Sequence, residues 1–175
     1  MKWIFPAILC FCPFFFNCGN PNIEPGDSGS LKQDKIYYPY SATSDYIIGK
    51  GQHSKIIMDV WRAFEVGNLK QKSDFFAPEI SLLFPDHHMS GKRDSILNLW
   101  QQRRNEYSSV QVRVDGWAPL YSKDLNENLV MIWGRLEMED RNGKFVHKTI
   151  LEKWGINGTG KIDYMQQFIN AAYTQ

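Results

Sequence analysis

The segment Val110–Asp115 reads Val-Gln-Val-Arg-Val-Asp, and it decides how the rest of the chain is interpreted. Valine alternates with a polar or charged residue throughout, which is the pattern of a strand with one buried and one solvated face. Before this segment, apolar residues recur at helical spacing instead. The change of period therefore marks the passage from a helical region to a region of strands.

Two main helices are predicted before this segment. The first, over residues 53–66, has apolar side chains at i, i+3, i+4 and i+7, the spacing of one buried stripe: Ile57, Val60, Trp61 and Phe64. The second is predicted over residues 92–107, with these side chains on its inner face: Ile96, Trp100, Arg103 or Arg104, and Tyr107. Between them we expect a short helix at 73–76, a strand at 80–84 and a loop at 85–88.

Three more strands are predicted after the alternating segment, over residues 129–138, 145–154 and 161–169. Turn sequences at 140–143 and 157–160 separate them. Helices followed by a meander of antiparallel strands, with the helices packed on one face, define an α+β architecture.

The amino-terminal residues 1–17 are predicted to be a signal peptide. Their apolar run is shorter than the about 20 residues that a transmembrane helix needs. All three cysteines, Cys10, Cys12 and Cys18, lie in or at the end of this run, so the remaining chain has no disulfide or cysteine metal site. The run ending at Cys18 resembles a bacterial lipoprotein signal of the Bacteroidetes type, which implies lipid attachment to the Cys18 sulfur. The alternatives are an ordinary secreted protein and an uncleaved anchor.

Lipid attachment implies a membrane-anchored protein of the cell envelope, on the periplasmic or outer-membrane face. Residues 18–51 are then a linker and extended arm, rich at first in turn-forming residues. Residues 52–175 form the folded domain. A formal net charge of +1 and the lack of a basic run give no support for a nucleic-acid partner.

The order of elements in this domain resembles the SnoaL-like family of nuclear-transport-factor-2-like (NTF2-like) proteins. The resemblance rests on Val-Gly-Asn-Leu at 66–69, Asp-Phe-Phe-Ala-Pro at 74–78 and Asn-Gly-Thr-Gly-Lys-Ile at 157–162. It implies a cystatin-like cone, in which a strongly curved antiparallel sheet holds helices on its concave side, often around an apolar pocket. Members include ketosteroid isomerase, polyketide cyclases, dehydratases and noncatalytic binding or dimerisation modules, so the fold leaves the function open.

Counting residues from Gly67, which the family shares, assigns the catalytic positions of ketosteroid isomerase to residues of this chain. The general base falls at Phe84, the tyrosine donor at Val60, and the neutral acid near Glu152. Because phenylalanine and valine cannot transfer protons, isomerase chemistry by that mechanism is not expected.

Glu152 is the first candidate for acid–base chemistry. It alternates with Ile150 and Trp154 on one face of a predicted strand. If that face lines the cone, burial raises the pKa of the carboxyl, and the group could act as an acid or base. The alternative, which we favour at this stage, is an ion pair with Lys148 or Arg135 across the sheet.

Asp86 and His87 are the second candidates, in a loop expected at the mouth of the cone. They could shuttle protons or hold a metal, whereas an exposed polar loop is the simpler interpretation. The side chains of His87 and His88 point apart in an extended chain, and His147 would have to converge from a distant strand. We therefore expect no metal site and no cofactor.

Six aromatic residues are candidates for lining a pocket for an apolar or ring-shaped ligand: Trp61, Phe84, Trp100, Trp117, Trp133 and Trp154. Core filling is the alternative for at least two of them. Arg103 and Arg104 could meet an anionic ligand, or lie on a solvated helix face.

The leading hypothesis is a noncatalytic envelope lipoprotein whose domain binds a small apolar molecule or a protein partner. The second is an enzyme of the lyase or isomerase type that uses Glu152 or the Asp86–His87 loop. The third is a homodimeric interaction module that pairs through its open sheet face.

Overall fold

The computed structural model describes residues 46–174. The predicted signal peptide, the lipidation site at Cys18 and most of the predicted linker at 18–51 lie outside this range. Within the range, none of the helices has the length and apolar character needed to cross a bilayer.

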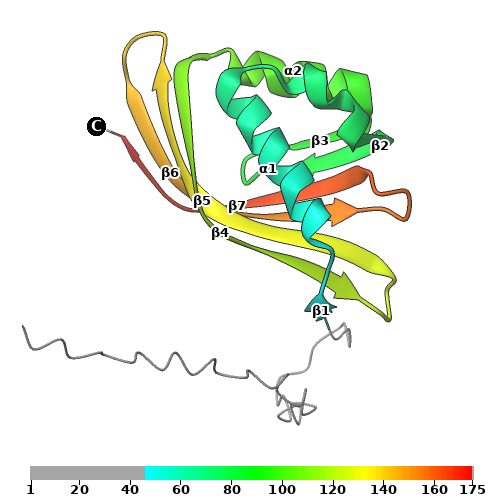
Figure 1. Ribbon diagram of the computed structural model, residues 1–175. Helices are drawn as coiled ribbons and strands as arrows, with labels where there is room; N and C mark the ends of the chain where they lie inside the picture. The colour runs from blue at the N-terminus through cyan, green and yellow to red at the C-terminus, as the bar shows by residue number, and fades with distance from the viewer. Residues whose placement is uncertain (1–45, 175) are drawn as a thin grey trace, which may run out of the picture. The chain divides into compact units, whose positions relative to one another are not determined.

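The domain consists of a seven-stranded sheet whose strands follow the order β1-β4-β5-β6-β7-β2-β3. Along the chain, its elements are β1 (Tyr46–Ile48), α1 (Gly51–Val66), the 3₁₀ helix η1 (Leu69–Phe75), β2 (Phe76–Leu83), β3 (His88–Lys92), α2 (Arg93–Arg104), β4 (Tyr107–Ser122), β5 (Glu127–Asp140), β6 (Phe145–Ile156) and β7 (Ile162–Thr174). Figure 1 shows that the long strands bend strongly and that α1 and α2 lie on the concave side. The predicted α+β cone is thereby confirmed.

One pair of strands departs from the antiparallel pattern. β2 runs parallel to β7, with Leu82 opposite Met165, whereas every other neighbouring pair is antiparallel. The sheet is therefore mixed, because the β2–β3 hairpin joins the far side of β7 rather than the meander's first strand.

The first helix forms where its apolar stripe predicts it. Ile57 and Val60 are fully buried, and Trp61 is 5% exposed. The helix ends at Gly67, whose φ of 75° lies in the left-handed region that only glycine adopts without strain. The amide N–H groups of Gly67 and Asn68 donate to carbonyls of the last helical turn, as is typical of a glycine-terminated helix.

The segment after this helix differs from the prediction. The predicted short helix at 73–76 is instead the 3₁₀ helix η1, and the predicted strand at 80–84 begins four residues earlier, at Phe76. The predicted loop at 85–88 is the tight connection of a hairpin whose second strand, β3, is not expected from the sequence. β3 buries only Met89, so it carries no period that a sequence pattern could reveal.

The second helix is shorter than predicted, because it ends at Arg104 and Tyr107 already belongs to β4. Arg104 is buried and does not lie on a solvated face. Its guanidinium donates to the carbonyl oxygens of Phe64 (2.7 Å), Glu65 (2.8 Å) and Tyr107 (2.9 Å). It thereby satisfies carbonyls at the end of α1 that have no partner within the helix.

The predicted arm contributes a strand to the sheet. Residues 46–48 form β1 and pair antiparallel with the end of β4, so the sheet begins before the predicted domain boundary at 52. The Gly49 N–H donates to the Pro119 carbonyl at 2.9 Å, and a side chain at Gly49 would meet the Leu120 backbone at 2.9 Å.

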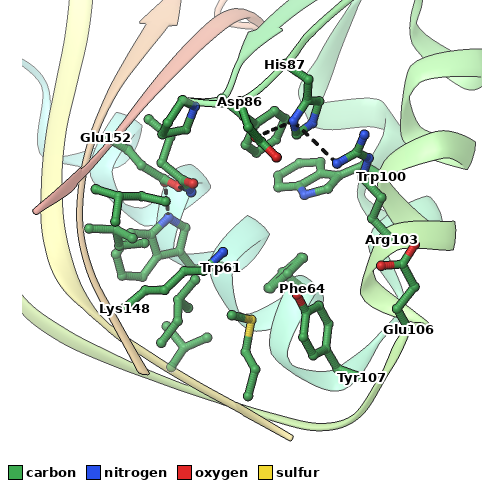
Figure 2. Close-up of a pocket in the computed structure, with 18 residues that line it drawn as sticks. Trp61, Phe64, Asp86, His87, Trp100, Arg103, Glu106, Tyr107, Lys148 and Glu152 are labelled. Carbon is green, nitrogen blue, oxygen red and sulfur yellow. Dashed lines mark hydrogen bonds and ion pairs between the residues drawn. The ribbon is translucent and has the colours of Figure 1, made fainter. Parts of the chain in front are cut away.

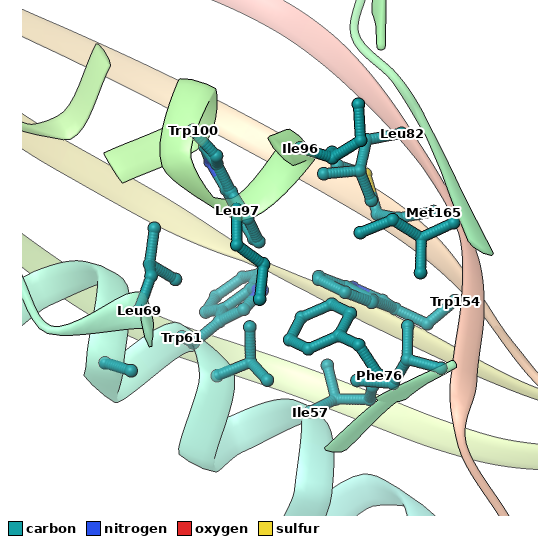
Figure 3. Close-up of a cluster of buried hydrophobic side chains, with 14 of the residues drawn as sticks. Ile57, Trp61, Leu69, Phe76, Leu82, Ile96, Leu97, Trp100, Trp154 and Met165 are labelled. Atoms are coloured by element: carbon teal, nitrogen blue, oxygen red, sulfur yellow. The ribbon is translucent and has the colours of Figure 1, made fainter. Parts of the chain in front are cut away.

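The core fills the space between α1, α2 and the concave face of the sheet (Figure 3). Its largest fully buried side chains come from α1, α2, η1 and four strands: Trp154, Phe76, Ile57, Leu69, Leu82, Leu97, Ile132, Ile150, Ile162, Met165, Val60 and Val130.

Candidate functional site

A cavity of about 350 Å³ lies beside this core, on the same concave side of the sheet. This volume is at the low end of the range for small-molecule sites, about 300–1,000 Å³. Figure 2 shows its walls, which come from both helices, the β2–β3 connection and strands β4 to β7. Most lining side chains are aromatic or aliphatic: Trp61, Phe64, Phe84, Pro85, Trp100, Tyr107, Val112, Leu136, Met138, Ile150 and Ile169.

Glu152 lies in the inner wall of the cavity and is only 3% exposed. Oε2 accepts hydrogen bonds from the indole N–H groups of Trp61 (2.6 Å) and Trp154 (2.9 Å). Oε1 accepts one from the side-chain amide of Gln167 (2.7 Å), which lies directly across on β7. Each carboxylate oxygen has two lone pairs, so Oε1 retains one for a further partner.

Two opposing effects set the pKa of Glu152. Burial disfavours the charged form and raises the pKa, while the hydrogen bonds from Gln167, Trp61 and Trp154 favour the charged form and lower it. The effect of burial is the larger, so the pKa of this carboxyl lies above its ordinary value. The raised pKa lets this carboxyl hold a proton at a higher pH than an ordinary glutamate does, so it could serve as an acid as well as a base.

The ion pairs that we favoured for Glu152 from the sequence do not form. Lys148 lies four residues earlier on the same strand, about 13 Å away along the chain at a strand's rise per residue. Arg135 instead donates from Nε and Nη2 to the two carboxylate oxygens of Asp115, at 3.1 and 3.0 Å. Only indole and amide donors therefore hold Glu152.

His87 lines the outer part of the cavity, with 20% of its side chain exposed. Its Nδ1 lies 2.5 Å from Asp86 Oδ1, and its ring stacks on Phe84 with centroids 4.5 Å apart. The hydrogen bond to His87 lowers the pKa of the Asp86 carboxyl. Nδ1–H therefore donates to Asp86, and Nε2 is the ring nitrogen left for another partner. Nε2 is buried and has no hydrogen-bond partner among residues 46–174.

The other histidines do not join this site. The His88 side chain makes a 2.9 Å contact with Ser81 Oγ, and His147 is outside the cavity lining. Among residues 46–174, no three side chains of histidine, cysteine, aspartate or glutamate come together in a way that could hold a metal ion.

The aromatic candidates divide into three groups. Trp61, Phe84 and Trp100 line the cavity, as predicted. Trp154 is fully buried beside it and reaches the site through its hydrogen bond to Glu152. The expectation for Trp117 and Trp133 is wrong, because they are 51% and 41% exposed and do not line the cavity.

The isomerase positions are also placed by the structure. Phe84 and Glu152 both line the cavity, whereas Val60 is fully buried in the core and does not reach it. Phe84, the position to which counting assigned the general base, serves as the stacking surface for His87.

Sequence reasoning missed three polar residues of the cavity wall, Glu106, Tyr107 and Gln167, and treated Lys148 only as an ion-pair partner. Lys148 shares the inward face of β6 with Ile150 and Glu152, a placement that period-two alternation could have revealed. Tyr107 had been assigned to a helix, and burial raises the pKa of its hydroxyl.

No family model matches this sequence, and no curated protein matches it. Solved structures, however, share its fold. The epoxide hydrolase/cyclase-like enzyme SalBIII, described in pyran ring formation in the polyether salinomycin, aligns with a TM-score of 0.55 and 15% identity over 68% of this chain and 91% of its own. An NTF2-like protein of unknown function from Exiguobacterium sp. 255-15 aligns with a TM-score of 0.56 and 13% identity over 66% of this chain and 98% of its own. Together with the topology, these likenesses show that residues 46–174 adopt the SnoaL-like, NTF2-like α+β fold.

Proposed function

We propose that this domain binds a small, largely apolar molecule in the cavity, and that Glu152 anchors a polar group of that molecule. The observation that carries the proposal is the buried carboxyl of Glu152, held by three N–H donors in the wall of an aromatic-lined cavity. Burying a carboxyl costs free energy unless hydrogen bonds or an opposite charge compensate for the water that it loses. The one lone pair left on Oε1 is a place where a ligand hydroxyl or amide can donate.

The aromatic wall supports a flat or ring-shaped ligand. Trp100 packs against Phe64 and Phe84, with ring centroids 5.8 and 6.3 Å away, so both helices and the β2–β3 connection contribute to one aromatic wall. Aromatic side chains contribute large apolar contact areas and prefer stacked or edge-on partners.

Dye binding, measured for wild type and for a variant whose larger side chain fills the cavity, tests this proposal. The neutral dye N-phenyl-1-naphthylamine should bind the full-length chain saturably and quench its tryptophan emission, because three tryptophans lie at or beside the cavity. A Val112→Phe variant should weaken binding at least about tenfold, which corresponds to about 1.4 kcal/mol. Val66→Phe, at an exposed position on α1, is the matched control. Equal binding by wild type and Val112→Phe would place the dye elsewhere and remove the proposal.

A second candidate function is acid–base catalysis of the lyase or isomerase type. It is favoured by two proton-transfer groups in the lining of one cavity, Glu152 and the unpartnered Nε2 of His87. SalBIII, which has the same fold, is described as a cyclase-like enzyme of ring formation. The fold is therefore compatible with such chemistry.

The Glu152→Gln variant separates the two functions. Glutamine keeps an oxygen that can accept from both indoles, but its NH2 group replaces Oε1 and can neither accept from a ligand nor transfer a proton. Ligand affinity should therefore fall by about tenfold, for one lost hydrogen bond, whereas turnover at saturating substrate should fall at least about 100-fold. A substrate that is found and turned over at an unchanged rate by this variant removes the catalytic candidate.

We further propose that the chain is a lipoprotein of the cell envelope, anchored through Cys18. The support is the apolar run that ends at this cysteine. A Cys18→Ser variant expressed in a bacterial host should leave the membrane fraction, while Cys12→Ser, within the predicted signal peptide, should not. Membrane retention of Cys18→Ser would overturn the lipid anchor.

A further inference from the structure

Two cationic side chains line the cavity, and neither forms an ion pair with a carboxylate of residues 46–174. Lys148 extends from β6, and Figure 2 shows its ammonium group pointing toward the middle of the cavity. It makes no hydrogen bond or ion pair with any residue in the described range 46–174. Arg103, an exposed residue of α2, lines the same cavity, and its one hydrogen-bond contact within residues 46–174 is with His87, Nη1 lying 3.3 Å from Nδ1.

The contact between Arg103 and His87 does not give the guanidinium N–H groups a hydrogen-bond acceptor. A ring nitrogen either donates or accepts, and Nδ1 of His87 is 2.5 Å from the carboxylate of Asp86, where it must donate. Nδ1 then has no lone pair for Arg103. The five N–H donors of this guanidinium thus have no hydrogen-bond acceptor among the residues that the structure describes.

The carboxylates around the cavity form no ion pair with these cations within residues 46–174. Glu152 is hydrogen-bonded to Trp61, Trp154 and Gln167, and Asp86 is hydrogen-bonded to His87. The charge of Arg103 does act on Asp86, because it helps to lower the pKa of that carboxyl. Glu106, the remaining acidic side chain of the lining, is exposed and is not ion-paired with either cation. The cavity therefore combines an apolar wall with two cations that have no ion-pair partner in the described part of the chain.

We infer that the ligand is a small aromatic or alicyclic carboxylate, whose anionic group is bound by Lys148 and Arg103. This inference rests on the proposed function and adds the class of ligand to it. The ring would pack against Trp61, Phe64 and Trp100, which leaves a polar substituent at the other end to meet Glu152. Charge-assisted hydrogen bonds are stronger than neutral ones, and an apolar surrounding strengthens them further.

Paired probes test the charge requirement in the full-length chain. A series of aromatic carboxylates of one to three rings is titrated beside the corresponding primary amides, with tryptophan emission as the readout. The amide has nearly the same shape but no charge, so the ratio of the two affinities isolates the anionic group. Wild type should bind the best carboxylate at least about tenfold more tightly than its amide, the discrimination expected of one charged hydrogen bond.

Variants assign that preference to the two cations. Lys148→Met keeps the length of the side chain and removes its charge, so the carboxylate preference should fall to near unity while amide affinity stays the same. Arg103→Gln is the second variant, and it should reduce the preference in the same direction. Lys153→Met is the matched control, because Lys153 lies on the same strand, outside the cavity lining and over the ring of Tyr164. Thermal melting confirms that each variant is folded.

The outcomes distinguish the inference from the function on which it rests. If wild type binds amides and carboxylates equally, or if the preference persists in both Lys148→Met and Arg103→Gln, the anionic ligand is overturned and cavity binding stands. If neither the neutral dye nor any probe of either series binds, both proposals fail. A preference lost equally in Lys153→Met would also overturn the assignment, because general surface charge would then explain it.

Discussion

Glu152 is a residue whose protonation is coupled to folding. Burial raises the pKa of its carboxyl in the folded protein above the value it has in the unfolded chain. The folded state therefore holds this proton more tightly than the unfolded state does. The contribution of protonated Glu152 to the free energy of unfolding is fully present at low pH. It is lost as the pH rises from the pKa of the unfolded chain through the higher pKa of the folded protein.

We predict that the free energy of unfolding of wild type, relative to that of Glu152→Gln, falls as the pH rises from 4 to 8. The glutamine variant has no proton to lose at this position and should lack the slope. Denaturant titrations of both proteins across this range provide the measurement. Parallel pH profiles for the two proteins would show that the carboxyl titrates normally.

Arg104 is the second residue whose chemistry carries stability, because one guanidinium holds three carbonyls from two elements. We predict that Arg104→Ala lowers the free energy of unfolding by about 2–4 kcal/mol, since buried carbonyls lose charged donors. Arg104→Lys should restore little of this, because an ammonium cannot reproduce the planar fork. Arg93→Lys, at the half-buried first residue of α2, is the control and should change stability by less than about 0.5 kcal/mol. Equal stability of Arg104→Ala and wild type would contradict this role.

At the scale of elements, the bend between β4 and β5 positions the inner wall of the site. The register of this pair shifts between Val114 and Gly116, where an added residue bends a strand. Gly134 lies opposite Val114, and a side chain there would meet the Arg113 carbonyl oxygen at 2.0 Å and the Trp61 ring at 3.1 Å. The missing side chain thus allows α1 to bring Trp61 close enough to reach Glu152.

We predict that Gly134→Ala destabilises the domain by about 1–3 kcal/mol, because the new methyl group overlaps backbone. Gly116→Ala is the matched change on the neighbouring strand, where the new methyl group would overlap only the Trp133 ring, at 2.3 Å. That ring is 41% exposed and can rotate into solvent, so the cost should stay below about 1 kcal/mol. Thermal denaturation of both variants measures the difference, and a larger loss in Gly116→Ala would refute this account of the bend.

At the scale of the whole molecule, three large apolar side chains form an exposed row across the sheet. Trp133, Leu151 and Phe168 are direct neighbours on β5, β6 and β7, with 41%, 37% and 44% of each side chain exposed. Contiguous exposed apolar surface is typical of interaction sites, and it favours the proposal of a homodimer through this face.

We predict that the full-length chain self-associates and that Leu151→Lys shifts it to monomer, because a charge at the centre of the row cannot be buried without a partner. Val66→Lys, at an exposed position on α1, should leave association unchanged. Sedimentation velocity in detergent, over a hundredfold range of protein concentration, measures the shift. A wild type that remains monomeric throughout that range contradicts the prediction.

Local patterns determined much of the architecture from the sequence alone. The stripe Ile57–Phe64 predicted α1, and the alternation at Val110–Asp115 predicted β4, because burial of one side of an element leaves a period in the sequence. Order and spacing of elements also pointed to the correct fold. The short edge strands β1 and β3 were not predicted, since each buries at most one side chain and so has no period.

Only the tertiary structure decided which polar residues meet. Alternation placed Glu152 on the inner face of its strand, but its partners Trp61 and Gln167 come from positions 91 residues before it and 15 after it. No local pattern predicts contacts between such distant residues, because they depend on how far the sheet bends and where α1 crosses it. The bend of the sheet and the position of the helices also decided which tryptophans line the cavity. Trp61 and Trp100 lie in its wall, whereas Trp117 and Trp133 are exposed outside it. The sequence thus determined which side chains were available for a site, and the curvature of the sheet decided which of them surround one cavity.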